Sequence, residues 1–418
     1  MSGIAALAPF RTRSFRFQWP ADLCTAWALE METLILGWYV LVETGSVVWL
    51  TVFGSLQFVG TLISPLLGVL GDRVGLRNVL AVMRACYTVF AAVLLLLALT
   101  GQLTPTLVLM IAAMSGMVRP SDIGMRSALV GATVPSGHLV AAMGISRTTQ
   151  DSARIGGALA GAGFMAAFGM APAYMAITGI YLAGALLTLL VDGKPGARPV
   201  VVAGAAPVVR SSPWRDLKEG LDYVWRTPRL LAAMSLAALV NLTAFPLTGG
   251  LMPYIARDVF HLDQHGLGFL VASFASGSFV GSMTLSLIGS RVQPARTMIA
   301  AAVVWYLCLV GFVLARSLPL AMGLLVVAGI AQSLSMVTLA IILLRTTEER
   351  FRGRIMGVRM LAIYTLPLGL LVAGAMIPQI GYHATALIFV LMGLMLTLEI
   401  AVNWRADLIA KDAIGNEG

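Results

Sequence analysis

Long apolar segments, each about the length of a membrane-crossing helix, follow one another along nearly the whole chain. A bilayer-spanning helix needs roughly 20 mostly apolar residues. Hydrophobic residues make up 59% of the 418 residues, and charged residues only 11%, whereas a soluble domain averages about 25% charged residues. Too few polar groups are present to cover a water-facing globule, so the chain is predicted to be a polytopic all-α membrane protein.

Short polar breaks separate about twelve such segments, and their spacing predicts where the spans lie. The predicted spans cover roughly residues 20–42, 46–70, 77–99, 105–130, 142–168, 173–192, 230–256, 266–290, 296–315, 319–344, 355–378 and 383–403. A longer polar stretch at 193–229 divides them into an N-terminal half (1–192) and a C-terminal half (230–418). Within this linker, Pro213 to Trp225 has apolar residues at helical spacing, which predicts an amphipathic helix on the membrane surface.

The charges outside these segments are unevenly distributed. Most lysines and arginines fall on one side of the predicted map, and only Arg257 and Arg316 fall in loops on the other side. Because basic loops resist translocation, this bias predicts that both termini are cytoplasmic. It also accounts for the net charge of +9 without nucleic acid, for which no basic run interleaved with exposed aromatic residues is found.

A charged loop follows the second predicted span, and its residue types suit a tight cytoplasmic turn. Glycines at 68, 71 and 75 allow close backbone approach, Asp72 can accept hydrogen bonds from a helix N-terminus, and Arg73 and Arg77 can pair with carboxylates. The simplest alternative is an ordinary solvated turn.

This loop, Gly68-Val69-Leu70-Gly71-Asp72-Arg73-Val74-Gly75-Leu76-Arg77, resembles the signature between helices 2 and 3 of the major facilitator superfamily. It departs from that signature at Leu76, where the family usually has a basic residue. The resemblance implies twelve transmembrane helices in two six-helix bundles, with one central cavity lined by helices 1, 4, 7 and 10. It also implies transport by alternating access, with Gly68, Asp72, Arg73, Gly75, Arg77 and Arg354 as a cytoplasmic gate.

Three further segments, at 38–46, 216–224 and 352–357, resemble the drug–proton antiporter branch that includes macrolide and enterobactin exporters. The resemblance implies proton-driven export of amphipathic organic compounds, such as siderophores or hydrophobic drugs, across a bacterial inner membrane. The glycine pattern of helix 5 in that branch is only partly present, because Arg154-Ile155-Gly156-Gly157 lacks the expected proline.

Two carboxylates lie in the first predicted span, and intramembrane acids usually face a partner or a watery cavity. Glu30 and Glu32 are two residues apart, so they cannot share one helix face. Because Asp22, Glu30, Thr33 and Gly37 fall roughly on one stripe, Glu30 is preferred over Glu32 for the cavity. Either can carry the coupled proton, and the alternative is a hydrogen bond between helices.

The fourth predicted span carries Arg119, Asp122 and Arg126 at spacings that share one face. Asp122 and Arg126 are predicted to form a local ion pair. Arg119 has no obvious local partner, and by the family resemblance it is the arginine that couples to the proton site. In the next span, Arg147, Asp151 and Arg154 suggest a gate network with Asp72 or Arg354, although a solvated helix end explains them equally well.

The second half has few charges within its predicted spans. Asn241 lies in the middle of helix 7, and Pro246, Gly249 and Gly250 follow it, so this helix is predicted to be bent or broken. Gln332 lies in the middle of helix 10. With the fold that the resemblance implies, Glu30, Arg119, Asn241 and Gln332 are the candidate cavity residues.

The sequence has no Walker-type phosphate loop, no His or Cys cluster at metal-ligand spacing, and no nucleophile–base arrangement. We therefore expect no cofactor and no enzymatic activity. The expected partners are protons, membrane lipid and an amphipathic small molecule, bound by a monomer. Proton-coupled uptake of a small metabolite and a non-transporting membrane receptor are the alternative functions.

Overall fold

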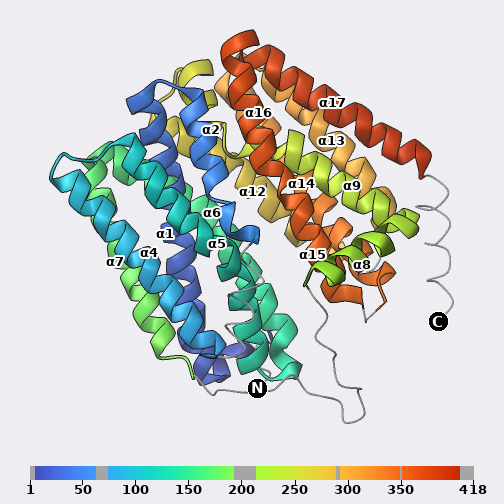
Figure 1. The fold of residues 1–418 in the computed structure, drawn as a ribbon, viewed down its shortest axis with the longest axis horizontal. Coiled ribbons are helices and arrows are strands. Elements are labelled where there is room, and N and C mark those ends of the chain that lie inside the picture. The colour runs from blue at the N-terminus through green and yellow to red at the C-terminus, as the bar shows by residue number, and fades with distance from the viewer. Residues whose placement is uncertain (1–4, 63–73, 193–212, 289–291, 349–350, 405–418) are drawn as a thin grey trace. The chain divides into compact units, whose positions relative to one another are not determined.

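The computed structural model describes residues 5–62, 74–192, 213–288, 292–348 and 351–404, and these residues form helices joined by short connections (Figure 1). The elements before the linker are η1 (Ala5–Arg11), α1 (Arg13–Thr44), α2 (Val47–Leu56), η2 (Val59–Leu62), α4 (Leu76–Leu99), α5 (Pro105–Thr133), α6 (Ser136–Phe168) and α7 (Met170–Leu189).

The elements after the linker begin with α8 (Pro213–Arg226), α9 (Pro228–Thr243), α10 (Phe245–Thr248), α11 (Met252–Tyr254) and the π-helical turn η3 (Ile255–Val259). They continue with α12 (Gln264–Ile288), α13 (Pro294–Leu314), α14 (Leu318–Thr346), α15 (Arg352–Ile363), α16 (Thr365–Ile380) and α17 (Tyr382–Asn403).

Within the described residues, nine helices are long and apolar enough to cross a membrane, and two shorter apolar helices span Val47–Thr61 and Pro228–Thr243. This inventory is consistent with the twelve predicted spans. Large apolar side chains lie exposed on the helices, among them Val82, Leu186, Met395 and Val402. Water would penalise such surfaces, and a lipid environment does not.

Contacts divide the chain into two compact units. Unit 1 comprises Met1–Ala206 with Leu262–Ala272, and unit 2 comprises Pro207–His261 with Ser273–Gly418. The first residues of α12 therefore belong to unit 1 and the rest of that helix to unit 2. The domain limits at 192 and 230 remain a prediction.

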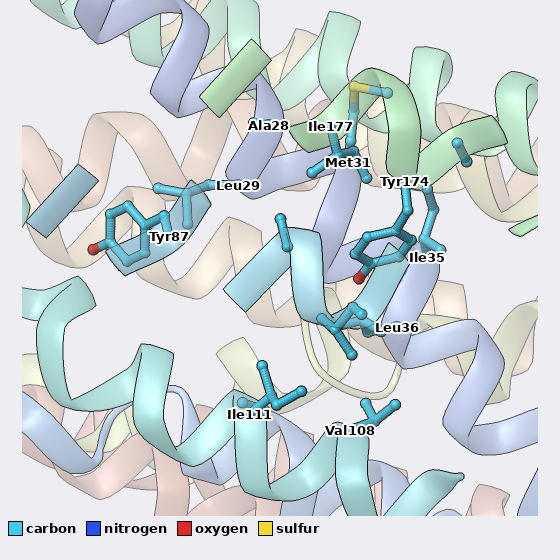
Figure 2. Close-up of a cluster of buried hydrophobic side chains, with 14 of the residues drawn as sticks. Ala28, Leu29, Met31, Ile35, Leu36, Tyr87, Val108, Ile111, Tyr174 and Ile177 are labelled. Carbon is cyan, nitrogen blue, oxygen red and sulfur yellow. The ribbon is translucent and has the colours of Figure 1, made fainter. Parts of the chain in front are cut away.

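In unit 1, α1 packs against both α6 and α7, and α4 packs against α7. Figure 2 shows the apolar cluster that these helices share, with Ala28 and Ile35 from α1, Tyr87 from α4, and Tyr174 and Ile177 from α7. The cluster packs against the middle of α1, where Glu32 lies buried, whereas Glu30 on the same helix is partly exposed.

The predicted break in helix 7 is confirmed. Helix α9 ends at Thr243, and the short elements α10 and α11 continue the chain. Pro246 lies at the start of α10, and Gly249, with φ −131° and ψ −93°, ends it. A proline lacks the N–H that would continue the helical ladder, so the interruption follows directly from the local sequence.

Both units contain a very close helix crossing made by glycines. In unit 1, a Cβ atom on Gly116 of α5 would lie 2.0 Å from the carbonyl oxygen of Leu56, and one on Gly60 would lie 2.1 Å from that of Met117. In unit 2, a Cβ on Gly277 of α12 would lie 2.0 Å from the Val326 oxygen. One on Gly329 of α14 would lie 2.1 Å from the Phe274 oxygen. Only glycine permits backbones to approach this closely.

The amphipathic helix predicted in the linker is present as α8. It packs on α15, with Gly220 close to Arg354, Tyr223 stacked on Phe351 at 4.4 Å between ring centroids, and Val224 buried. Trp225 is 76% exposed. The predicted apolar stripe is therefore divided between a face that packs on α15 and an exposed edge.

Candidate functional site

A small pocket with a mostly apolar lining and a few polar side chains lies inside unit 1, against the middle of α1. Its α1 wall consists of Leu29, Glu32, Thr33 and Leu36, which are spaced so that they share one helix face. The remaining wall comes from α2 and α5 and consists of Phe53, Gln57, Ile111, Ala112, Ser115, Gly116 and Arg119. The cavity measures about 20 Å³, which is room for about one water molecule.

Arg119 is held in this pocket by uncharged groups. Its guanidinium donates hydrogen bonds to the side chain of Gln57 and, at 2.8 Å, to the hydroxyl of Thr33. Among the described residues, no carboxylate lies within ion-pair distance of Arg119. An arginine is always protonated in proteins, so a positive charge faces the pocket without a directly paired anion.

Glu32 is buried beside the same pocket, and the hydroxyl of Tyr181 on α7 donates a hydrogen bond to it at 2.7 Å. Glu30 points elsewhere: its side chain is 34% exposed, and one carboxylate oxygen lies 4.0 Å from Arg154 Nε on α6. The sequence analysis preferred Glu30 for the cavity, but the pocket is lined by Glu32. The reason is that Thr33 lies on the same face of α1 as Leu29, Glu32 and Leu36. The functional roles of both glutamates remain predictions.

A second polar cluster lies deeper in unit 1 and joins α1, α4, α5 and α7. Arg84 of α4 is fully buried, forms a direct ion pair with Asp22 and donates a hydrogen bond to Thr188. Its Nε lies 3.9 Å from Asp122, which in turn lies 2.9 Å from Arg126. The predicted Asp122–Arg126 pair is thus confirmed, as one half of a charge-balanced group of two carboxylates and two arginines.

The sequence analysis missed Arg84. Its signal was available, because an arginine within the long apolar run of helix 3 is expensive in a membrane unless it has partners. Two other residues were missed in unit 2. Arg359 lies half-buried in α15, and the exposed Glu399 of α17 lies at a groove of about 350 Å³ beside α9.

The predicted gate residues are only partly described. Gly68, Asp72 and Arg73 lie outside the described residues. Gly75 has a φ of +96°, which favours glycine, and Arg77 donates a hydrogen bond to Asn78 at 2.9 Å. Arg354 pairs with Glu219 of α8 at 2.9 Å. Arg147 pairs with Asp151 at 3.4 Å. The gate remains a prediction.

The candidate cavity residues of unit 2 make one hydrogen bond within a helix and one between helices α12 and α14. The Asn241 amide donates to the Ala237 carbonyl oxygen at 2.8 Å, and Gln332 accepts from Ser278 at 2.9 Å. Thr243 and Tyr306 share a hydrogen bond of 2.6 Å at the end of α9, next to the break in helix 7. These groups are polar but uncharged.

The membrane-length helices form a multi-pass membrane protein with the major facilitator fold. Solved structures with this fold are similar. They include the nucleoside transporter NupG, with a TM-score of 0.71 at 15% identity over 93% of this chain and 98% of that one. A POT family transporter in complex with 5-aminolevulinic acid has a TM-score of 0.73 at 12% identity, over 95% and 97% of the two chains. A bacterial homologue of the iron transporter ferroportin has a TM-score of 0.69 at 14% identity, over 94% and 98%.

The chain belongs to the transmembrane secretion effector family, which matches residues 4–416. It is similar to the multidrug efflux pump Tap of Mycobacterium tuberculosis, at 29% identity over 173 residues that make up 41% of each chain. The Tap pump of Mycolicibacterium fortuitum is 27% identical over 43% of each chain. The match therefore spans about two fifths of these relatives. The family match, which spans nearly the whole chain, identifies a multi-pass membrane protein of a transporter family and not of an enzyme family.

Proposed function

We propose that this transporter exports amphipathic organic compounds, namely hydrophobic drugs or siderophores, in exchange for protons. The similarity to pumps named for multidrug efflux supports the export of drugs. The resemblance of the segments at 38–46, 216–224 and 352–357 to drug–proton antiporters supports the same proposal. The proposed location is a bacterial inner membrane with both termini in the cytoplasm.

The observation that carries this proposal is that Glu32 and Arg119 line one pocket, while each is bonded to a different neutral group. When Glu32 is ionised, the two charges balance. When Glu32 takes up a proton, the uncompensated charge of Arg119 is left to attract a polar or anionic part of the substrate. Protonation thus changes the electrostatics of the pocket by one full charge, as a coupling site requires.

The remaining candidate residues complete the proposed cycle. Asn241 and Gln332 would contribute uncharged contacts to the substrate, and Glu30 is the alternative proton carrier. Gly68, Asp72, Arg73, Gly75, Arg77 and Arg354 would hold the cytoplasmic side closed while the carrier faces outward. Rocking of two helix bundles around the substrate would then alternate access between the two sides.

The proton site is tested with purified protein in liposomes that contain a pH-sensitive dye. Ethidium represents the drug class and enterobactin the siderophore class. We expect Glu32→Gln to abolish substrate-driven proton movement, because the amide cannot titrate. Glu30→Gln is the matched control, since it makes the same change two residues away on the same helix, and it should retain coupling. Full coupling in Glu32→Gln would refute the assignment to Glu32.

The direction of transport is tested in inside-out membrane vesicles with an imposed proton gradient. Export predicts that ethidium or enterobactin accumulates inside the vesicles and that a protonophore prevents it. Accumulation only in right-side-out vesicles would instead support uptake by symport. Binding of both compounds without any flux would support a receptor.

A further inference from the structure

Polar groups continue through unit 1 from the Glu32–Arg119 pocket to the cluster around Arg84. Along α5, Arg119 and Asp122 are one turn apart, and along α4 Arg84 and Tyr87 are one turn apart. Residues at this spacing lie on one helix face. Two sites with ionisable groups therefore follow one another along the same helices.

Tyr87 lies at the junction of the two sites. Its ring lies 5.6 Å from the ring of Tyr181, centroid to centroid, and Tyr181 holds Glu32. Charged groups of both sites interact electrostatically with the Tyr87 hydroxyl. Among them the interaction with Asp122 is strongest, followed by those with Arg119, Arg126 and Arg84. Tyr87 is a buried member of the apolar cluster, and in Figure 2 its hydroxyl points away from Ile35, Leu36 and Tyr174.

The Tyr87 hydroxyl and both oxygens of Asp122 are buried without a hydrogen bond among the described residues, although Asp122 Oδ2 is ion-paired with Arg126. Within the described part of the chain, the Tyr87 hydroxyl has no hydrogen-bond partner. Asp122 Oδ1 likewise accepts no hydrogen bond there, and it lies 3.9 Å from Arg84 Nε. Buried polar groups normally have partners, and those that lack one call for a functional or solvent explanation.

We propose that Tyr181 and Tyr87 relay protons between Glu32 and Asp122, which makes Asp122 a second carboxyl of the transport cycle. This inference rests on the proposed proton role of Glu32. A hydroxyl oxygen can accept one proton while it releases its own. The proton that leaves Glu32 joins the Tyr181 oxygen, and the Tyr181 proton passes through bridging water to Tyr87. The Tyr87 proton then passes, again through bridging water, to Asp122 Oδ1. Both tyrosines end neutral, Glu32 becomes a carboxylate and Asp122 a carboxylic acid.

The charges around each end allow this exchange. Glu32 accepts a hydrogen bond from Tyr181 and is attracted electrostatically by Arg119, and its own charge also reaches Tyr174. Arg84, Arg126 and Tyr87 surround Asp122, and Asp22 lies within the same electrostatic group. When Asp122 is protonated, Arg84 keeps its ion pair with Asp22, and Arg126 loses its carboxylate partner. The proton would therefore loosen the link within α5 without releasing Arg84.

The relay is tested with Tyr87→Phe and Tyr181→Phe, which keep the buried rings and remove only the hydroxyls. Tyr174→Phe is the matched control: Tyr174 is on the same helix as Tyr181, it is equally buried, and its hydroxyl also lacks a partner among the described residues. Tyr174 differs from Tyr87 in that it has no electrostatic interaction with Asp122.

Two assays are compared in liposomes, with whichever of ethidium and enterobactin the wild-type protein exports. Proton-driven efflux requires net proton movement, whereas substrate–substrate exchange at equal pH does not. We expect Tyr87→Phe and Tyr181→Phe to slow proton-driven efflux by roughly a hundredfold and to leave exchange unchanged. Asp122→Asn should behave likewise. Tyr174→Phe should match the wild-type protein in both assays.

The outcomes separate this inference from the proposed function. If Glu32→Gln loses coupling while Tyr87→Phe retains normal proton-driven efflux, the relay is refuted and the function of Glu32 stands. If Glu32→Gln retains coupling, the proposed proton site itself is refuted. Equal losses of efflux and exchange in Tyr87→Phe would show a packing role and would also refute the relay. Because phenylalanine preserves the ring, this test does not depend on whether Asp122→Asn folds.

Discussion

The two units share a way of packing helices but differ in what they bury. In each, glycines allow two helices to cross with their backbones in contact, at Gly60 and Gly116 in unit 1 and at Gly277 and Gly329 in unit 2. Unit 1 buries charged side chains, namely Asp22, Glu32, Arg84, Asp122, Arg126 and Asp151. Among the buried residues described in unit 2, the polar side chains are uncharged, and they include Asn241, Thr243, Ser278, Gln332 and Ser335.

This difference indicates that the two units, although packed in a similar way, have different roles. Buried charges are costly in an apolar interior and are retained where they are paired or do work. Neutral amide and hydroxyl groups do not change their net charge near neutral pH, but they can fix helix positions and line a cavity. Unit 1 is therefore suited to sensing protons, while unit 2 contains the broken helix 7, which is suited to bending.

The largest expected effect comes from removing the central charge of unit 1. Arg84→Leu would leave two carboxylates, Asp22 and Asp122, with one arginine between them, and should lower the free energy of unfolding by about 3–5 kcal/mol. The comparison in unit 2 is Tyr306→Phe, which removes one neutral hydrogen bond to Thr243 and should cost about 1 kcal/mol. Unfolding of the purified proteins in detergent measures both values. If both variants lost the same free energy of unfolding, the buried charges of unit 1 would not differ in importance from the neutral groups of unit 2.

An intermediate effect is expected at the crossing that both units share. Gly329→Ala would push a methyl group into the backbone of α12 and should destabilise the protein by about 1–3 kcal/mol. Gly116→Ala should have a similar effect in unit 1. Gly323→Ala is the matched control on α14, because a Cβ there meets no atom within 4 Å. The melting temperature of each variant provides the test, and a control as unstable as Gly329→Ala would contradict the shared crossing.

The smallest effect is expected outside the spans, at the start of α12. The backbone N–H of Gly266 and the side chain of His265 stabilise the charged form of Asp263 and lower the pKa of its carboxyl. A lowered folded-state pKa means that this stabilisation is present above the unfolded pKa of about 3.9 and is lost as the pH falls through the folded value.

Asp263→Ala should therefore cost about 1 kcal/mol at pH 7 and less at pH 3. Asp263→Asn keeps a capping oxygen without a titrating group, so its stability relative to the wild-type protein should rise as the pH falls. Melting temperatures at the two pH values measure this. A pH-independent cost of Asp263→Ala would show that the charge of Asp263 does not stabilise the loop.

Much of the fold followed from local patterns. The apolar segments predicted the helices, Pro246 and the glycines after it predicted the break in helix 7, and the i, i+4 spacing predicted the Asp122–Arg126 pair. The site was harder to predict. Helical periodicity placed Thr33 near Glu30 as readily as near Glu32, and only the position of Arg119 shows which face of α1 meets the pocket.

The sequence by itself determined that this protein is a multi-pass helical membrane protein, because hydrophobic length and periodicity are properties of short stretches of chain. The tertiary structure decided which charges meet. Glu32 and Tyr181 are 149 residues apart, and Asp22 and Arg84 are 62 residues apart. No local pattern contains such pairs. They form because packing α1, α4, α5 and α7 together excludes water, and a buried charge must then find its partner on another helix.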